Sequence, residues 1–122
     1  MGKKKNVIKE KSFDFGKRIV RMCKYLEKNK KEYVLSKQLK RSGTAPGALV
    51  RESEYAESKK DFIHKLSVAL KEANETDYWL HLVMEGEYIT KSEFDSIWKD
   101  CDEIISILVA ILKTSRGDNN TN

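Results

Sequence analysis

The chain has 122 residues, 39% of them hydrophobic and 35% charged, which suits one soluble domain, and its one proline favours long helices over a turn-rich β fold. The longest apolar run is far too short to cross a bilayer, so we expect no membrane partner. The N-terminal stretch lacks the apolar segment of a secretory signal, and the two cysteines lie far apart in the sequence. We therefore expect a cytoplasmic protein. Charge is uneven, because residues 1–51 hold 16 Lys and Arg against 4 Asp and Glu, whereas residues 52–122 hold 8 against 15.

The N-terminal part of the chain predicts a tail and then a helix. Residues 1–11 are basic and lack helical periodicity, so we expect a flexible tail. Ser12 is the expected N-cap of the first helix, which ends near Asn29. The apolar face of this helix is formed by residues at helical spacing, namely Phe15, Ile19, Met22, Cys23 and Leu26.

A second helical region begins near Glu32 and contains the small-residue stretch "RSGTAPGA", residues 41–48. A phosphate-binding loop is not expected there, because no strand precedes the stretch and no Gly-Lys-Ser/Thr ends it. Small side chains instead let another helix approach closely, and Pro46 predicts a kink in this helix. We therefore interpret Gly43, Pro46 and Gly47 as helix-packing residues.

Two further helices are indicated by their capping residues. Ser58 with Asp61 opens the third, Gly86 ends it, and Thr90 opens the fourth. The polar residues 116–122 are expected to be disordered. Together these elements predict an all-α fold, an antiparallel up-and-down four-helix bundle over residues 12–115.

The end of the fourth helix is apolar on nearly all sides from Ile104 to Leu112. A helix of a monomeric bundle needs one apolar stripe, so this segment predicts a homo-oligomer. The candidate interface residues are Ile104, Ile107, Leu108, Val109 and Ile111.

The segment 41–83 carries a specific motif, R-S-G-T-x-x-G-A followed by S-K-x-D-F and K-E-A-x-E-T-x-Y-W-L. It resembles the 23S rRNA intervening-sequence proteins, one branch of which has Ile, Asn and Ala where this chain has Pro46, Leu49 and Ser53. The matching residues are Arg41, Ser42, Gly43, Thr44, Gly47, Ala48, Glu52, Ser58, Lys59, Asp61, Phe62, Lys71, Glu72, Ala73, Glu75, Thr76, Tyr78, Trp79 and Leu80.

The resemblance covers about residues 12–113 and implies a non-catalytic antiparallel bundle that assembles as a ring, commonly a pentamer. Similar proteins serve diversity-generating retroelements, where they bind the reverse transcriptase and nucleic acid. A reverse transcriptase, RNA and DNA are therefore the partners that the resemblance suggests, besides further copies of the chain.

The residues themselves leave two functions open. An enzyme, a metal site and a cofactor are not expected, because the two histidines, His64 and His81, lie 17 residues apart on one helix. A nucleic-acid-binding scaffold would use a basic band on the first two helices, formed by Lys17, Arg18, Arg21, Lys24, Lys28, Lys37, Lys40 and Arg41. In a protein-interaction scaffold the basic helices would instead meet acidic ones, with Arg41 and Glu52 fixing helix register and Trp79 packing.

Overall fold

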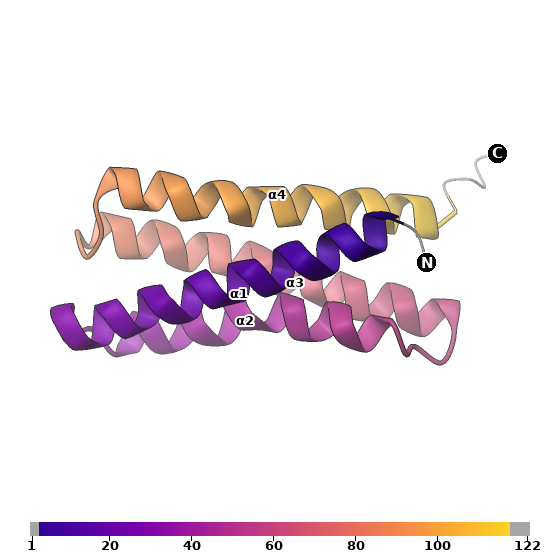
Figure 1. Cartoon of the computed structure of the whole chain (residues 1–122), viewed down its shortest axis with the longest axis horizontal. Helices are drawn as coiled ribbons and strands as arrows, with labels where there is room; N and C mark the ends of the chain where they lie inside the picture. Colours follow the sequence, from indigo (N-terminus) through magenta and orange to yellow (C-terminus); the bar gives the residue numbers. More distant parts are fainter. Residues whose placement is uncertain (1–2, 118–122) are drawn as a thin grey trace.

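The computed structural model describes residues 3–117 of the chain. Within that range it contains no strand and four helices, which are α1 (Lys3–Lys30), α2 (Val34–Ser53), α3 (Lys59–Glu85) and α4 (Lys91–Ser115). The predicted all-α, four-helix architecture is therefore confirmed. Figure 1 shows that the chain reverses its direction at each connection between successive helices.

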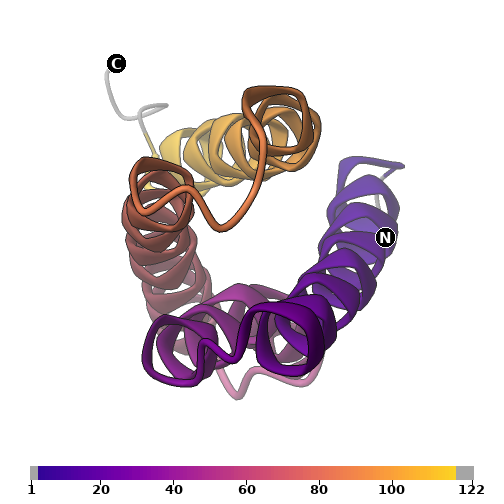
Figure 2. The same cartoon turned by 90° about the vertical axis from the view of Figure 1, so that its left-hand side faces the viewer.

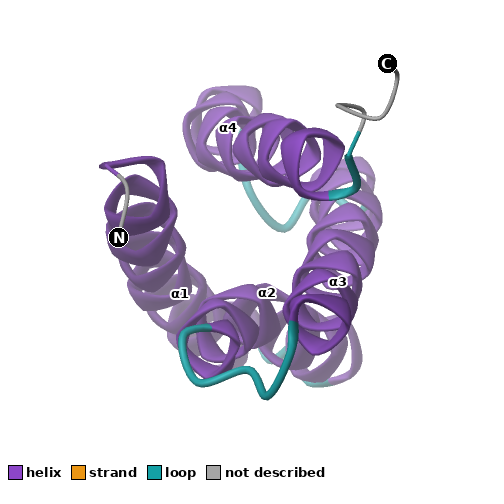
Figure 3. Cartoon of the chain, turned by 90° about the vertical axis from the view of Figure 1, so that its right-hand side faces the viewer, coloured by secondary structure: helices purple, strands orange, loops and turns teal. Residues whose placement is uncertain are grey.

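The four helices surround one hydrophobic core. Each helix packs against two neighbours, and α4 returns to α1. The views along the bundle show that the ribbons of α1 and α4 stand further apart than those of the other neighbours (Figures 2 and 3). Buried apolar side chains from all four helices fill the centre, and Phe15, Leu39, Leu80 and Leu108 are among the largest.

Helix α1 begins much earlier than the sequence indicated. The expected tail over residues 1–11 is wrong from residue 3 onward, because α1 starts at Lys3 and Ile8 is 1% exposed in the core. Ser12 is not an N-cap but an interior residue of α1, buried, with its hydroxyl donating to the carbonyl oxygen of Lys9 (3.3 Å). Ile8 and Ser12 continue the stripe of Phe15 toward the N-terminus, and a serine in a core position hid that periodicity.

The C-terminal segment is partly described. Arg116 donates to the Ser67 hydroxyl at 2.7 Å, and Gly117 is buried. Two residues of the expected disordered segment 116–122 are thus tied to the bundle. Residues 118–122, like residues 1–2, lie outside the described part of the chain.

Local hydrogen bonds account for the helix ends. The Ser58 hydroxyl accepts from the Asp61 amide, and Thr90 and Glu93 form a complete capping box, as their spacing predicted. Helix α3 stops at Gly86, which donates its backbone N–H to the Leu82 carbonyl. Helix α2 starts at Val34, close to the start that was expected near Glu32.

The start of α2 is capped by Glu32, which lies two residues before the first residue of the helix. Tyr33 occupies the N-cap position without a side-chain hydrogen bond. The carboxylate of Glu32 takes over this role and accepts from the amides of Leu35 (3.1 Å) and Ser36 (2.9 Å). Its negative charge also suits the positive end of the helix dipole.

The stretch 41–48 lies within α2 and faces α1 closely. An added Cβ on Gly43 would lie 2.7 Å from Cγ1 of Ile19, and one on Gly47 would lie 3.2 Å from the carbonyl oxygen of Ser12. A larger side chain at Gly43 would displace the side chain of Ile19, and one at Gly47 would press on the backbone of Ser12. Pro46 is buried inside the same helix, and the kink there stays a prediction.

Two glycine replacements measure this close approach. We expect Gly43→Ala to be less stable to unfolding than Gly16→Ala by about 1–3 kcal/mol, the cost of overpacking a filled core. An alanine at Gly16 meets no atom within 4 Å, and both replacements gain similar helix propensity, so their difference isolates the contact with Ile19. Urea unfolding of the two variants checks this, and equal stabilities would contradict it.

Candidate nucleic-acid interface

A stripe of cations runs along the exposed side of α1, and we call it the α1 cation stripe. Lys17, Arg21, Lys24 and Lys28 follow one another at spacings of four, three and four residues, so they share one helix face. All four are exposed, and the stripe is about 17 Å long at ~1.5 Å per residue. Lys17 lies 3.2 Å from the exposed carboxylate of Asp14, while the other three form no ion pair within residues 3–117.

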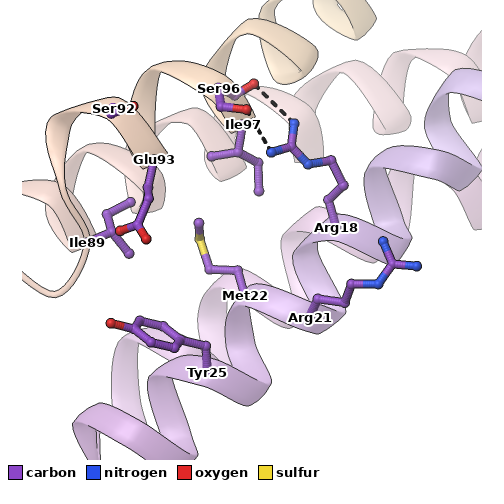
Figure 4. A pocket seen from close by; sticks show the side chains of 9 residues that line it. All are labelled: Arg18, Arg21, Met22, Tyr25, Ile89, Ser92, Glu93, Ser96 and Ile97. Atoms are coloured by element: carbon purple, nitrogen blue, oxygen red, sulfur yellow. Dashed lines mark hydrogen bonds between the residues drawn. The ribbon is translucent and has the colours of Figure 1, made fainter.

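Arg18 does not belong to this stripe, because it points to α4. Its guanidinium donates to the Asp100 carboxylate (2.7 Å) and to the carbonyl (3.1 Å) and hydroxyl (2.9 Å) oxygens of Ser96. Figure 4 shows Arg18 turned toward Ser96, whereas the guanidinium of Arg21 points away from Met22 and Ile97. Arg18 therefore links two helices and is not free for a phosphate.

The space between α1 and α4 is a cavity of about 460 Å³ (Figure 4). Met22, Ile89 and Ile97 give it an apolar lining. Glu93 also lines it, and the carboxylate of this residue accepts from the Thr90 amide at 2.8 Å. Arg18 and Arg21 also line this cavity, so its charge is mixed and it adjoins the cation stripe at Arg21.

Two further cations of the expected basic band form ion pairs with carboxylates on neighbouring helices. Lys40 lies 3.3 Å from the Glu27 carboxylate of α1. Arg41 pairs with Glu72 of α3 at 3.0 Å and also with Glu75. The pKa of Glu75 lies below its ordinary value, first because Trp79 Nε1 donates to its carboxylate (3.0 Å) and further because of Arg41.

Of the α2 candidates, Lys37 is exposed and has no ion pair in the described part of the chain. The sequence analysis missed Arg51, whose guanidinium carbon lies 5.5 Å from the centre of the Phe13 ring. The α1 residue four positions from Phe13 is Lys17, and its Nζ lies 4.9 Å from the same ring centre. These contacts surround an exposed aromatic ring with two cations.

Phe13 lies in a groove of about 690 Å³ on the outside of the bundle, between α1 and α2. We call it the α1–α2 groove. Small residues of both helices form much of its lining, and Phe13 and Val20 add exposed apolar surface. The lining residues are Ser12, Phe13, Gly16, Lys17, Val20, Arg21, Thr44, Gly47, Ala48 and Arg51.

The expected oligomer interface on α4 needs a correction. Ile104 and Leu108 are 1% and 0% exposed, so they belong to the core of this chain and cannot meet a partner subunit. Ile107 and Ile111 are half-buried against the same core, and Val109 is 46% exposed. Among the described residues of α4, Val109 is thus the large apolar side chain that is exposed, and Ile107 and Ile111 lie on the other flank of the helix.

The two remaining helix-packing candidates, Trp79 and Glu52, also differ in burial. Trp79 is half-buried against the core, with its ring N–H bonded to Glu75. Glu52 is exposed and forms no ion pair among residues 7–117, whose side chains the structure describes, so the register role expected of it stays a prediction. Arg41 connects α2 to α3 without it.

The groups most suited to covalent or metal chemistry are poorly placed for it. Cys23 and Cys101 are buried free thiols, and burial raises the pKa of Cys101 to about 12. Burial also raises the pKa of Cys23. Within residues 3–117, no group of three or more His, Cys, Asp or Glu residues is arranged to hold a metal, and no helix has the length and hydropathy to cross a membrane.

Comparison with known proteins gives one family. The family described as 23S rRNA-intervening sequence protein matches residues 4–110. A crystal structure of a protein of unknown function from the S23 ribosomal protein family of Bacteroides thetaiotaomicron is 53% identical, with a TM-score of 0.89 over 90% of this chain and 98% of that one. The sequence has no significant match among functionally curated proteins.

The carboxylate of Glu75, which is held by Trp79 and by Arg41, predicts a pH dependence of stability. The pKa of Glu75 is lower in the folded state, so its contribution is present above the ordinary value of 4.5 and is lost as the pH falls through the folded value. We expect Glu75→Gln to be less stable than wild type at pH 7, by up to about 1 kcal/mol, and this difference to shrink at about pH 3. Urea unfolding at both pH values measures it.

The matched control is Glu85→Gln, which removes an exposed carboxylate near the end of the same helix. Glu85 has no ion pair among the described residues. We expect this variant to follow the wild-type pH response. A Glu75→Gln variant with the same pH response would show that the charge of Glu75, with its contacts to Trp79 and Arg41, contributes nothing to stability.

Proposed function

Since the chain belongs to the 23S rRNA-intervening sequence protein family, we propose that it is a non-catalytic scaffold that binds RNA or DNA through the basic side of α1 and α2. The observation that carries the proposal is the α1 cation stripe. Its four cations are exposed, and three of them have no ion pair in the described chain. Lys37 of α2 adds a fifth exposed cation.

The spacing of the stripe suits a phosphate backbone. Successive phosphates of one duplex strand are separated by about 3.4 Å along the axis, so a stripe of about 17 Å faces roughly five of them. Lysine and arginine contacts to phosphates fix position without reading bases. Binding through this stripe is therefore sensitive to salt and weakly dependent on sequence.

The absence of catalysis is part of the proposal and has separate support. Both thiols are buried and held protonated by their surroundings, so neither suits a nucleophile. His81 lies beside Asp77 on the surface of α3, and His64 is exposed on the same helix. Among the described residues, neither histidine forms a hydrogen bond with a cysteine or with the other histidine.

A second candidate function, a protein-interaction scaffold that self-associates, is favoured by Val109. It is 46% exposed on α4, and Ile105, four residues earlier on the same side of the helix, is half-buried. Covering this surface with another copy removes apolar area from water. The ring assembly implied by the family resemblance is consistent with such a contact, and it would repeat the cation stripe in each copy.

Charge reversal of the stripe tests nucleic-acid binding. We expect the triple variant Arg21→Glu, Lys24→Glu and Lys28→Glu to bind a fluorescent oligonucleotide at least tenfold more weakly at about 50 mM salt. Each lost phosphate contact also removes about 0.7–0.9 from the slope of log affinity against log salt. Fluorescence anisotropy over a salt series measures both quantities.

The matched control reverses three exposed lysines on the other two helices, Lys60, Lys71 and Lys99, and so changes the net charge equally. We expect a smaller loss of affinity and an unchanged salt slope. Equal losses in the two triple variants would show that net charge, not the stripe, governs binding. No binding by wild type at this salt concentration would leave the self-associating protein scaffold.

Replacement of Val109 tests self-association. We expect Val109→Asp to lower the mass of the wild-type assembly in multi-angle light scattering, because it buries a charge in the contact. Val34→Asp makes the same change at a valine that is 73% exposed at the start of α2, and we expect it to keep the wild-type mass. A monomeric wild type, or equal masses for both variants, would exclude the α4 contact.

A further inference from the structure

The α1–α2 groove has a composition that the cation stripe alone does not explain. Phe13 is 52% exposed and Val20 is 48% exposed, although both lie on a helix whose core face is filled by other residues. Gly16 and Gly47 have no side chains to cover this apolar surface. The result is an open, shallow space of about 690 Å³ with an aromatic ring at one end.

We propose that this groove receives the unpaired bases of single-stranded nucleic acid, with a base stacking on Phe13. The inference rests on the proposed function and adds to it the kind of nucleic acid that is bound. Base stacking on aromatic side chains beside a basic surface is the usual way in which proteins hold single strands.

Charge identifies the occupant as a polyanion. Three of the lining residues, Lys17, Arg21 and Arg51, carry positive charge, and none of the lining residues is acidic. Lys17 Nζ and Arg51 Cζ lie over the Phe13 ring, 4.9 Å and 5.5 Å from its centre, so a base that stacks on the ring takes the place of one of these cations and meets the other. An apolar peptide without acidic residues would bring no charge to balance Arg21 and Arg51, whereas a nucleotide supplies a base and a phosphate together.

The groove and the α1 cation stripe are continuous. Lys17 and Arg21 belong to both, and Lys24 and Lys28 continue along α1 beyond the groove. Phe13 and Val20 lie on the side of the stripe that faces α2. A strand whose phosphates follow the stripe would therefore direct its bases toward the groove.

This arrangement distinguishes single strands from duplexes. In a duplex the flat faces of the bases are stacked on one another, so a duplex could contact the stripe with its phosphates but could not cover Phe13. A flexible single strand exposes these faces. We therefore expect binding of single strands to depend on both the stripe and the ring, and binding of duplexes to depend on the stripe.

The experiment compares a 20-nucleotide oligo-dT with a 20-base-pair duplex, both fluorescein-labelled, by anisotropy at about 50 mM salt. We expect Phe13→Ala to weaken oligo-dT binding by about 5- to 100-fold, the range for loss of one base–aromatic stack, and to leave duplex binding unchanged. Phe13→Leu keeps an apolar side chain without a stacking face and should lose the same affinity. Phe13→Trp should restore it, and its fluorescence should be quenched by oligo-dT beyond the wild-type change.

The matched control is Tyr55→Ala, which removes an aromatic side chain that is 86% exposed and lies outside the groove. This variant should bind both probes as wild type does. If Phe13→Ala binds oligo-dT normally while the stripe variant does not, the inference fails and the proposed function stands. If wild type binds neither probe, both fail.

One further outcome would overturn the inference in favour of a protein partner. A Phe13→Ala variant with a lower mass in light scattering, and unchanged affinity for oligo-dT, would show that the groove is covered by a second copy of the chain. Circular dichroism of each variant confirms that the helices are retained before the comparison is made.

Discussion

The close contact between α1 and α2 is the constraint on which the rest of the molecule depends. Gly43 and Gly47 bring the backbone of α2 against Ile19 and Ser12, where an added Cβ would lie 2.7 Å and 3.2 Å from the nearest atoms. The same closeness leaves little side-chain material on the outer side of the two helices, and the α1–α2 groove follows from it. One stretch of small residues thus determines both an interior contact and an exposed surface.

Ion pairs between distant parts of the chain distribute the uneven charge of the sequence. Arg18 is held by Asp100, Arg41 by Glu72 and Glu75, and Lys11 by Glu103 at 3.2 Å. In each case a cation of the first half meets an acid of the second half. Part of the basic excess is therefore balanced within the fold, and much of the rest lies on the outer face of α1, with Lys37 and Arg51 on α2.

Much of the fold is readable from the sequence because its signals are local. The Ser58 cap, the Thr90–Glu93 capping box and the Gly86 stop depend on residues within one turn, and the structure has each of them where it was predicted. The start of α1 was missed because Ser12 occupies a core position, where its hydroxyl bonds to the helix backbone. A polar residue that satisfies its own hydrogen bond looks like a cap when only the sequence is available.

The candidate site was less predictable, because its composition depends on contacts over long sequence separations. Arg18 and Arg21 look alike in the sequence, and the position of Asp100 across the bundle decides that the first is paired. The core and surface residues at the apolar end of α4 are equally hard to tell apart from the sequence, since a helix that is apolar on all sides has no alternation of apolar and polar residues. Ile104 and Val109 are both aliphatic, and the tertiary packing makes one of them core and the other surface.

The separation of charge along the chain becomes a separation in space, because α1 and α2 adjoin each other and α3 and α4 follow around the core. The protein therefore has a permanent electric dipole, whose positive end is the side that carries the cation stripe. In the field of a polyanion such a dipole turns before any contact is made, and oriented encounters raise the association rate. This orientation acts over roughly one Debye length, about 8 Å at physiological ionic strength, so the rate of encounter responds to salt as well as the strength of the complex.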